Sequence, residues 1–449
     1  MAGIGNADAL LSRVTIVVLS RLGIWCGIEY DSAAPALSAR PEVHGRRSAY
    51  PGASTNRLLV GLARSPGGSE MRSVRIHSQS LAVSVPLYLS LTRRCYVHWR
   101  MLAGAIPPLD EASMAAARAR QDSLTKPQGS LGRLEALSIQ LAGITGRPRP
   151  RVSRKAVIVM AGDHGVARNG VSAYPSEVTR QMVLNFLRGG AAINVLARQA
   201  DARVTVVDVG VAADLEQAPG LERRKVAYGT ADCTRGPAMT AAQADAALQT
   251  GADVVAAEIA AGLDLVATGD MGIGNTTPSA AIVAALSGLP VARVTGRGTG
   301  VDEAGLARKI AAIETALAVN QPDQNDAFDV LCKVGGLEIA GLAGVIIGGA
   351  AQRVPVVIDG FISGAAALVA VGLAPAVRPY LIASHRSVEV GHRAIFDLLD
   401  MLPLLDFDLR LGEGTGAVLA FPIIEAACRI LDEMATFGEA GVSEKASGE

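Results

Sequence analysis

The chain has 449 residues, half of them apolar, and its 42 basic and 42 acidic residues leave no formal net charge. That length allows two or three domains with a large core, and the balanced charge excludes a chain that binds nucleic acid through its overall field. The most apolar region, 335–377, is interrupted by Glu338, Gln352, Arg353 and Asp359, so no unbroken run of about 20 apolar residues is available to cross a membrane.

Residues 1–100 differ from the rest in composition. They hold 12 Arg, no Lys and five acidic residues, whereas the remainder holds 30 basic and 37 acidic residues. One interpretation is an Arg-rich, acid-poor targeting peptide. The other, which we favour, is a poorly ordered extension, or upstream sequence translated before a true start at Met101. We therefore expect residues 1–100 to be dispensable for activity.

From Met101 onward the pattern becomes regular. Leucine and isoleucine recur at helical spacing over 131–144, which predicts a helix. Another helix is predicted to begin after the N-cap residue Ser176 and to end before Gly189 and Gly190. Five short apolar runs, each followed by a loop of small or polar residues, occur at 156–160, 204–208, 263–268, 354–358 and 380–383.

Strands that alternate with helices predict an α/β fold with a doubly wound, Rossmann-like parallel sheet. In this architecture ligands bind at the carboxyl ends of the strands, where all five loops lie. We expect residues 1–100 to be the extension and 101–150 to begin a small helical domain. The large domain with the substrate site is expected over 151–389, and the helical segment 390–449 completes the small domain.

The cysteines predict neither disulfides nor a zinc site. None are paired at CxxC spacing, their number is odd, and no Cys/His cluster accompanies them, which is typical of reduced thiols in a cytosolic protein. Asp163 and His164 follow the first predicted strand without a second ligand at useful spacing, so we expect no metal there and assign Asp163 to holding its loop together. The cysteines are Cys26, Cys95, Cys233, Cys332 and Cys428.

The segment GDMGIGNTT, residues 269–277, follows a predicted strand and opens a predicted helix. Gly272 and Gly274 would let backbone N–H groups approach an anion, and Asn275 and Thr276 add polar donors at a helix N-terminus. We interpret the segment as a phosphate cradle, with a plain Gly-rich turn as the alternative. Its spacing fits neither the P-loop nor the GxGxxG motif.

A second Gly-rich loop, TGRGTG at 295–300, contains Arg297 and Gly298 and precedes a predicted helix with Lys309. Each basic residue alone could be a solvated surface charge, but two Gly-rich loops with basic residues nearby indicate a phosphate monoester as ligand. Asp359 follows the fourth apolar run. It is placed to accept hydrogen bonds from sugar hydroxyls or to cap a turn, and both interpretations stay open.

The sharpest feature is RLGEGTGA at 410–417, where Glu413 lies between Gly412 and Gly414. The glycines let the backbone bring a carboxylate into a closed pocket, and the apolar segment that follows would exclude water from it. Desolvation raises the pKa of a Glu above ~4.3 and makes it a better base at neutral pH. The alternative is an ordinary Glu in a flexible turn.

Several motifs, in order over about residues 105–437, resemble the nicotinate-nucleotide–dimethylbenzimidazole phosphoribosyltransferase family of cobalamin lower-ligand synthesis. They are LTKPQGSLGRLE, AGDHGV, YPSEVTRQM, GDMGIGNTTPSAA, TGRGTG, VVIDGF, SHRS and RLGEGTGAVLA. The resemblance implies transfer of the 5-phosphoribosyl group of nicotinate mononucleotide to 5,6-dimethylbenzimidazole, which gives α-ribazole 5′-phosphate and nicotinate. It also implies a homodimer and a reaction that requires no metal or other cofactor.

The resemblance also implies roles for individual residues. Glu413 takes the role of general base, and Asp270, where the family often has Glu, lies near the reacting sugar. Ser176 and Gln181 match the border of the aromatic-base pocket. The positions that match the surroundings of the nucleotide phosphate and ribose are Gly272, Asn275, Thr276, Gly298, Lys309 and Arg410. Gly274 and Asp359 join them as substrate-binding candidates on the arguments above.

Two other functions stay open. One is a phosphoribosyltransferase that uses a pyrophosphate-activated sugar and magnesium. That class usually has two adjacent acids at the end of the corresponding strand, whereas Asp359 is followed here by Gly360. The other is a nucleotide- or benzimidazole-binding protein without catalysis, against which the presence of Glu413 argues.

Overall fold

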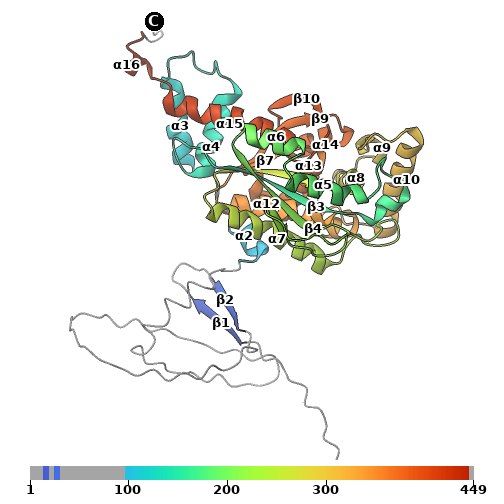
Figure 1. Cartoon of the computed structure of the whole chain (residues 1–449). Coiled ribbons are helices and arrows are strands. Elements are labelled where there is room, and N and C mark those ends of the chain that lie inside the picture. Colours follow the sequence, from blue (N-terminus) through green and yellow to red (C-terminus); the bar gives the residue numbers. More distant parts are fainter. Residues whose placement is uncertain (1–13, 20–24, 31–96, 444–449) are drawn as a thin grey trace, which may run out of the picture. The chain divides into compact units, whose positions relative to one another are not determined.

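The computed structural model describes residues 14–19, 25–30 and 97–443, and the chain divides into two units, Met1–Val97 and His98–Glu449 (Figure 1). In the first unit, strands β1 (Val14–Leu19) and β2 (Trp25–Tyr30) pair in antiparallel fashion. Apart from these strands, the predicted extension 1–100 falls almost entirely outside the described residues. Within the described part of the chain, no helix has the length and apolar character to span a membrane.

The second unit is built on a sheet of six parallel strands in the order β5-β4-β3-β6-β7-β8. The chain runs outward from β3 to β5, returns to place β6 beside β3, and then runs outward to β8, which is the doubly wound order. The predicted fold class and all five predicted strands are confirmed. The bounds are β3 (Lys155–Gly162), β4 (Ala202–Gly210), β5 (Leu221–Arg223), β6 (Leu265–Met271), β7 (Val356–Ile358) and β8 (Leu381–Ala383).

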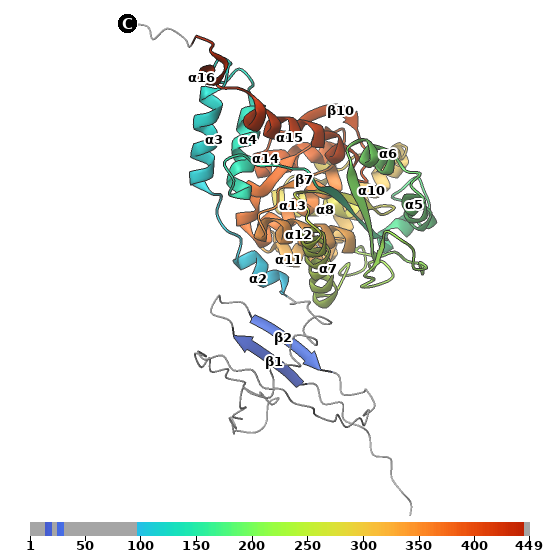
Figure 2. The same ribbon diagram turned by 60° about the vertical axis from the view of Figure 1, so that its left-hand side comes forward.

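Helices cover both faces of this sheet (Figures 1 and 2). Side chains alternate along β3, so that Ile158 and Met160 join one buried apolar cluster and Val157 and Val159 join the other. The first cluster includes α7 (Ala241–Ala260), α12 (Leu337–Ala351) and α13 (Phe361–Leu373). The second includes α4 (Arg133–Thr145), α5 (Glu177–Leu187), α6 (Ala192–Gln199) and α15 (Thr415–Glu433).

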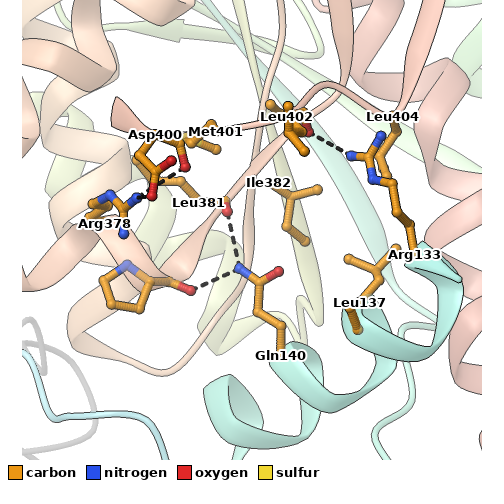
Figure 3. Close-up of a pocket in the computed structure, with 13 residues that line it drawn as sticks. Arg133, Leu137, Gln140, Arg378, Leu381, Ile382, Asp400, Met401, Leu402 and Leu404 are labelled. Atoms are coloured by element: carbon orange, nitrogen blue, oxygen red, sulfur yellow. Dashed lines mark hydrogen bonds and ion pairs between the residues drawn. The ribbon is translucent and has the colours of Figure 1, made fainter. Parts of the chain in front are cut away.

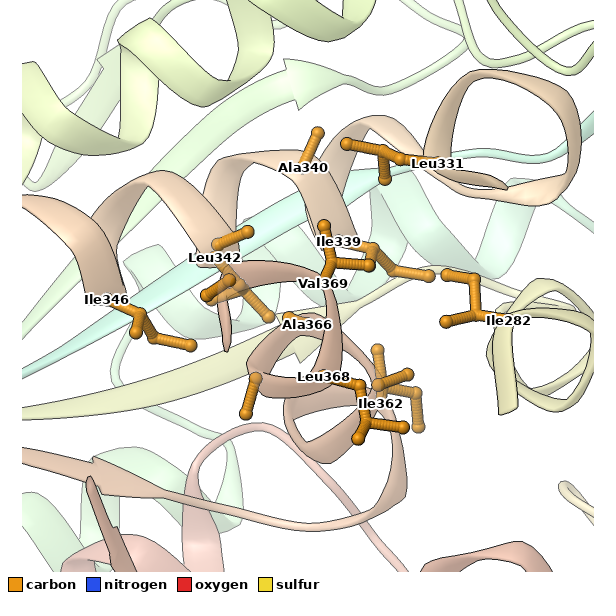
Figure 4. Close-up of a cluster of buried hydrophobic side chains, with 14 of the residues drawn as sticks. Ile282, Leu331, Ile339, Ala340, Leu342, Ile346, Ile362, Ala366, Leu368 and Val369 are labelled. Atoms are coloured by element: carbon orange, nitrogen blue, oxygen red, sulfur yellow. The ribbon is translucent and has the colours of Figure 1, made fainter. Parts of the chain in front are cut away.

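Small residues let helix α12 pack closely at the centre of the first cluster. A Cβ atom at Gly344 would meet the backbone oxygen of Leu248 on α7, so the two helices approach backbone to backbone. On its other side, α12 presents Ile339 and Leu342 toward Val369 of α13 (Figure 4). This packing fixes the N-terminus of α12, which lies next to the end of β3.

Helices from both ends of the second unit pack together beside the sheet. Figures 1 and 2 both draw α3 (Glu111–Ser123) and α4 next to α15. The Nε atom of Arg120 donates to the backbone oxygen of Leu431 at 2.6 Å, and Leu124 bridges to Thr436. Their status as a separate small domain with the predicted bounds stays a prediction.

The folded part of the second unit begins before the predicted boundary at residue 100. Helix α2 (Trp99–Gly104) packs on α7 and α12, and the Trp99 side chain is buried. Its Nε1 atom donates to Asp245 Oδ1 at 3.0 Å, and its backbone N–H donates to Gln249 Oε1 at 2.8 Å. Residues 98–100 therefore belong structurally to the second unit.

The remaining elements connect these layers. They are η1 (Gly165–Asn169), α8 (Thr276–Ser287), α9 (Val291–Val294), α10 (Glu303–Asn320), α11 (Ala327–Val334), η2 (Pro375–Tyr380), α14 (Val390–Leu399) and α16 (Phe437–Ala440). A separate parallel pair is formed by β9 (His385–Ser387) and β10 (Leu405–Leu409). Neither β5 nor this pair was predicted.

Candidate active site

The loop before α15 lies directly against the carboxyl end of β6. A Cβ atom at Gly269 would be 2.6 Å from the backbone oxygen of Glu413. One at Gly412 would be 3.2 Å from both carboxylate oxygens of Asp270. A side chain at either position would force the facing atoms to shift. The two glycines thus let the predicted catalytic carboxylates lie at the same strand end, although they are far apart in the chain.

Glu413 is held in a conformation that side chains rarely adopt. Its φ is 61°, and its neighbours Gly412 and Gly414 have φ values of 82° and 90°. A non-glycine residue in this left-handed region costs roughly 1–2 kcal/mol, which the surrounding fold must supply. The side chain is 5% exposed, and its Oε2 atom has no hydrogen-bond partner among the described residues.

The environment of Glu413 is that expected for a base at neutral pH. Burial raises the pKa of Glu413 to about 7, against the opposing effect of a hydrogen bond from the backbone N–H of Ile193. Ile193 lies at the start of α6, so the carboxylate faces a helix N-terminus. The predicted burial and raised pKa are present, and the catalytic role stays a prediction.

Asp270, the second predicted catalytic residue, is buried at the end of β6. Its Oδ2 atom accepts a 2.8 Å hydrogen bond from Asn275 Nδ2, and its Oδ1 atom has no partner among the described residues. Burial raises the pKa of Asp270 well above its ordinary value, and the nearby charge of Asp359 raises it further. Asn275 therefore contributes by holding this carboxyl group in place.

Asp359 caps the helix that follows Glu413. Its Oδ2 atom accepts from the backbone N–H of Gly414 at 3.1 Å, and its Oδ1 atom accepts from that of Ala417 at 3.0 Å. The Nδ1 atom of His385 lies 3.8 Å from Oδ1. The capping interpretation matches this geometry. A contact of Asp359 with a substrate sugar stays a prediction.

The two Gly-rich loops meet around Lys309. Its Nζ atom donates to Thr276 Oγ1 at 2.6 Å and to the backbone oxygen of Gly296 at 3.3 Å. The side chain is fully buried, and burial lowers the pKa of Lys309 to about 8. Arg410 joins the group through a 3.1 Å hydrogen bond to the backbone oxygen of Gly298.

Two glycines shape the first of these loops, whereas the arginine of the second points away. Gly272 packs so tightly that a Cβ atom there would meet the backbone oxygen of Gly162, and Gly274 has a φ of 87°. Both glycines are thus required by the turn that leads into α8. Arg297 is not directed to this group, because its guanidinium pairs with Glu303 at the surface.

A cavity of about 500 Å³ adjoins the end of β3. Ser176 and Gln181, predicted from the resemblance to border a base pocket, both line it. Ser176 occupies the N-cap position of α5, as predicted, but its side chain makes no capping hydrogen bond. Asp163 and His164 line the same cavity, and Asp163 Oδ2 accepts from the Ala212 backbone N–H at 2.7 Å, which confirms that Asp163 ties its loop to the next one.

A buried pair between His164 and Glu338 was not predicted. The His164 Nε2 atom lies 2.9 Å from Glu338 Oε1, and both side chains are excluded from solvent. Burial alone would lower the pKa of His164. The charge of Glu338, the hydrogen bond to it and the charge of Asp163 together outweigh burial and raise that pKa above its ordinary value. The available signal was a single Glu in the otherwise apolar segment that forms α12.

A second cavity, of about 310 Å³, lies between α4 and the edge strand β8 (Figure 3). Gln140 points across it and donates to the backbone oxygen of Leu381 at 3.1 Å, while Arg133 and Arg378 bind backbone oxygens at its rim. None of the predicted site residues lines it. The predicted site residues lie instead at the first cavity, in the two Gly-rich loops and in the Glu413 loop.

Comparison with known proteins agrees with this arrangement. A family model described as a phosphoribosyltransferase matches residues 106–442. The nicotinate-nucleotide–dimethylbenzimidazole phosphoribosyltransferase of Roseiflexus sp. (strain RS-1) is 69% identical over 340 residues, which cover 76% of this chain and 96% of that protein. The protein of the same name from Chloroflexus aggregans is 67% identical, with the same coverage.

Solved structures give the same result. The crystal structure of this phosphoribosyltransferase from Thermus thermophilus superposes with a TM-score of 0.72 at 52% identity. The match covers 75% of this chain and 100% of that one. With the family model spanning most of the chain and relatives matched over nearly their whole length, the chain belongs to the nicotinate-nucleotide–dimethylbenzimidazole phosphoribosyltransferase family.

Proposed function

We propose that this enzyme transfers the 5-phosphoribosyl group of nicotinate mononucleotide to 5,6-dimethylbenzimidazole, releasing nicotinate and α-ribazole 5′-phosphate, with Glu413 as general base. The observation that carries the proposal is Glu413 itself: a buried carboxylate with a pKa of about 7, next to Asp270 at the end of β6, with one oxygen that no described residue hydrogen-bonds. The names of the relatives state the two substrates.

The proposed reaction needs one proton acceptor and no proton donor. One ring nitrogen of the benzimidazole attacks the anomeric carbon of the ribose, and the bond from that carbon to the pyridinium nitrogen breaks. The pyridinium nitrogen takes the bonding electron pair and becomes the uncharged ring nitrogen of nicotinate, so its departure requires no general acid. The proton on the other benzimidazole nitrogen passes to Glu413, whose negative charge also stabilises a cationic, oxocarbenium-like transition state.

The surroundings suggest where each part of the substrates binds. Lys309 and the two Gly-rich loops form a cradle suited to the nucleotide phosphate, and Arg410 closes it from the side of the Glu413 loop. The 500 Å³ cavity lined by Ser176 and Gln181 is large enough for a bicyclic base. Asp270, one methylene shorter than the usual Glu of the family, would face the sugar between them.

A direct assay tests the reaction and its rivals. The purified protein is incubated with nicotinate mononucleotide and dimethylbenzimidazole, with and without a chelator, and nicotinate release is followed. We expect turnover that the chelator leaves unchanged. Loss of activity on chelation would favour the metal-dependent, pyrophosphate-activated class. Binding of both substrates without nicotinate release would identify a non-catalytic binding protein instead.

We also infer a cytoplasmic homodimer. Large apolar side chains on α14, on β10 and in the loops beside them are exposed, which supports an interface there. They include Val388, Val390, Phe407 and Leu411. Light scattering of the purified enzyme should give twice the chain mass. A monomer at micromolar concentration would refute the dimer, and recovery of the enzyme in a membrane fraction would refute the location.

A further inference from the structure

An unassigned acid, Glu389, lies buried against the second Gly-rich loop. It directly precedes α14 and is 8% exposed. Its Oε2 atom has no hydrogen-bond partner among the described residues. A Cβ atom at Gly296 would collide with that same oxygen, so the carboxylate is pressed against the loop backbone. A buried carboxylate oxygen that no described residue hydrogen-bonds is costly to keep in the folded state.

Gly296 connects Glu389 to Lys309. The backbone oxygen of Gly296 accepts a hydrogen bond from Lys309 Nζ, while its Cα faces Glu389. The position of Glu389 is fixed by the packing of α14 on α9, where a Cβ atom at Gly391 would be 2.5 Å from the backbone oxygen of Val294. The acid and the lysine thus approach the same loop from different helices.

Among the described residues, Glu389 is the acid that offsets the charge of Lys309. The two hydrogen bonds of Lys309 go to neutral oxygens, those of Thr276 and Gly296. Burial lowers the pKa of Lys309 to about 8, and the Glu389 carboxylate is the charge that acts against this effect. The nearby Arg297 pairs with Glu303.

The remaining arginines of the region are directed at backbone. Arg410 donates to the Gly298 oxygen at 3.1 Å, and Arg308, on the same helix as Lys309, donates to the Gly170 oxygen at 3.4 Å. Both side chains are basic, so neither can offset the charge of a protonated Lys309.

We propose that Glu389 is a positioning residue for the phosphate cradle, which keeps Lys309 protonated so that Lys309 can hold the phosphate group of nicotinate mononucleotide. This rests on the proposed function, which assigns the phosphate to this cradle. It leads to an unusual expectation. A carboxylate beside an anion site ordinarily weakens anion binding, so its removal would strengthen binding. Here we expect the opposite, because Lys309 loses its proton more easily without Glu389 and an uncharged lysine attracts no phosphate.

The test compares Glu389→Gln, which keeps the bulk next to Gly296, with Asp397→Asn, which makes the same chemical change at an exposed position of α14. The dissociation constant and KM of nicotinate mononucleotide are measured from pH 6 to 9. In Glu389→Gln we expect the pH above which binding fails to fall by about one unit, and hence ~10-fold weaker binding at alkaline pH. Binding near pH 6, kcat and the KM of dimethylbenzimidazole should match the wild type.

Two results would overturn the inference: a pH profile identical to that of the wild type, or tighter nucleotide binding at every pH. Glu389→Asp retains the charge and should restore the alkaline limit, which also covers the case of a Gln variant that does not fold. Titration with inorganic phosphate separates the two proposals. A wild type that binds phosphate but not the nucleotide refutes the proposed function, whereas the pH shift in Glu389→Gln would still support this inference. A wild type that binds neither refutes both.

Discussion

At the scale of single residues, the end of β6 gathers carboxylates whose environments differ. Both oxygens of Asp359 accept backbone N–H groups, and one oxygen of Glu338 is engaged by His164. Burial raises the pKa of Asp270 well above its ordinary value, and burial raises the pKa of Glu413 to about 7. A pKa of about 7 lets Glu413 gain and lose a proton near neutral pH, as a general base requires.

Replacement of Glu413 by Gln should separate binding from chemistry. We expect Glu413→Gln to fold and to bind nicotinate mononucleotide, while kcat falls by ~10²–10⁴-fold because no group accepts the benzimidazole proton. The wild-type kcat should rise as the pH increases through about 7, where Glu413 loses its proton, and this limb should be absent in the variant. The measurement is the rate of nicotinate release between pH 5.5 and 8.5 for both proteins. A near-normal rate in the variant would refute the role of Glu413 as general base.

The residues of this site could be predicted unequally from the sequence. Glu413 and the Gly-rich loops stood out because glycines on both sides of a polar residue mark close backbone approach, a local property. The pair of His164 and Glu338 could not be found in this way, since 174 residues separate the two side chains and no local sequence pattern links their segments. Arg297 had the right position in the loop, but its side-chain direction depends on Glu303.

At the scale of elements, the site depends on how β7 is joined to α15. The Asp359 carboxylate, at the end of β7, accepts two backbone N–H groups from the first turn of α15 and its preceding residue. It thereby fixes the residue that follows Glu413. The longer strands and helices were predictable from periodicity. Strands β5 and β9 were not predictable, although β7 and β8 are equally short. The sequences of β7 and β8, VVI and LIA, are apolar, whereas those of β5 and β9, LER and HRS, are mostly polar and form no apolar run.

Asp359→Asn tests this junction. The amide can accept at one oxygen only, so one backbone N–H of the junction loses its buried acceptor, at a cost of ~1–3 kcal/mol. We expect a lower melting temperature together with a reduced kcat, because the Glu413 loop loses its anchor. Asp122→Asn, an exposed change on α3, is the control and should alter neither quantity. A normal kcat in a destabilised Asp359→Asn would show that the cap serves stability alone.

Gly414→Ala tests the backbone of the same loop. Gly414 has a φ of 90°, and a Cβ atom would be 2.5 Å from Val157 Cγ2, on the central strand β3. Left-handed strain and this collision together should cost at least ~2 kcal/mol and displace Glu413. Gly438→Ala is the matched control, since a Cβ atom there meets nothing within 4 Å. Denaturant unfolding and kcat are measured for both; equal stability of the two variants would contradict the expectation.

At the scale of the whole molecule, the strand order explains why distant motifs meet. The reversal between β3 and β6 opens a crevice at their carboxyl ends, and the His164 loop, the Asp270 loop and the Glu413 loop all lie there. This arrangement could be predicted from the fold class. The start of the folded second unit could not, because Trp99 lies in a segment whose composition differs from the rest, and nothing around it in the sequence indicates that it is buried.

Two truncations test where that unit begins. Deletion of residues 1–97 should leave kcat and stability unchanged. Deletion of residues 1–100 also removes Trp99, which is 3% exposed, stacks on Phe328 and hydrogen-bonds to Asp245. Loss of a buried Trp typically costs ~3–5 kcal/mol, so the melting temperature should fall by several degrees. A chain that starts at Met101 would share this defect.

The shorter truncation supplies its own reporter. The sequence has two tryptophans, and only Trp99 remains once residues 1–97 are removed. Its fluorescence should show the blue-shifted emission of a buried indole and should move to longer wavelength in the same transition that abolishes activity. An early red shift, before activity is lost, would mean that α2 detaches on its own. Equal melting temperatures for the two truncations would mean that Trp99 contributes nothing to the stability of the enzyme and that the boundary predicted at residue 100 is adequate.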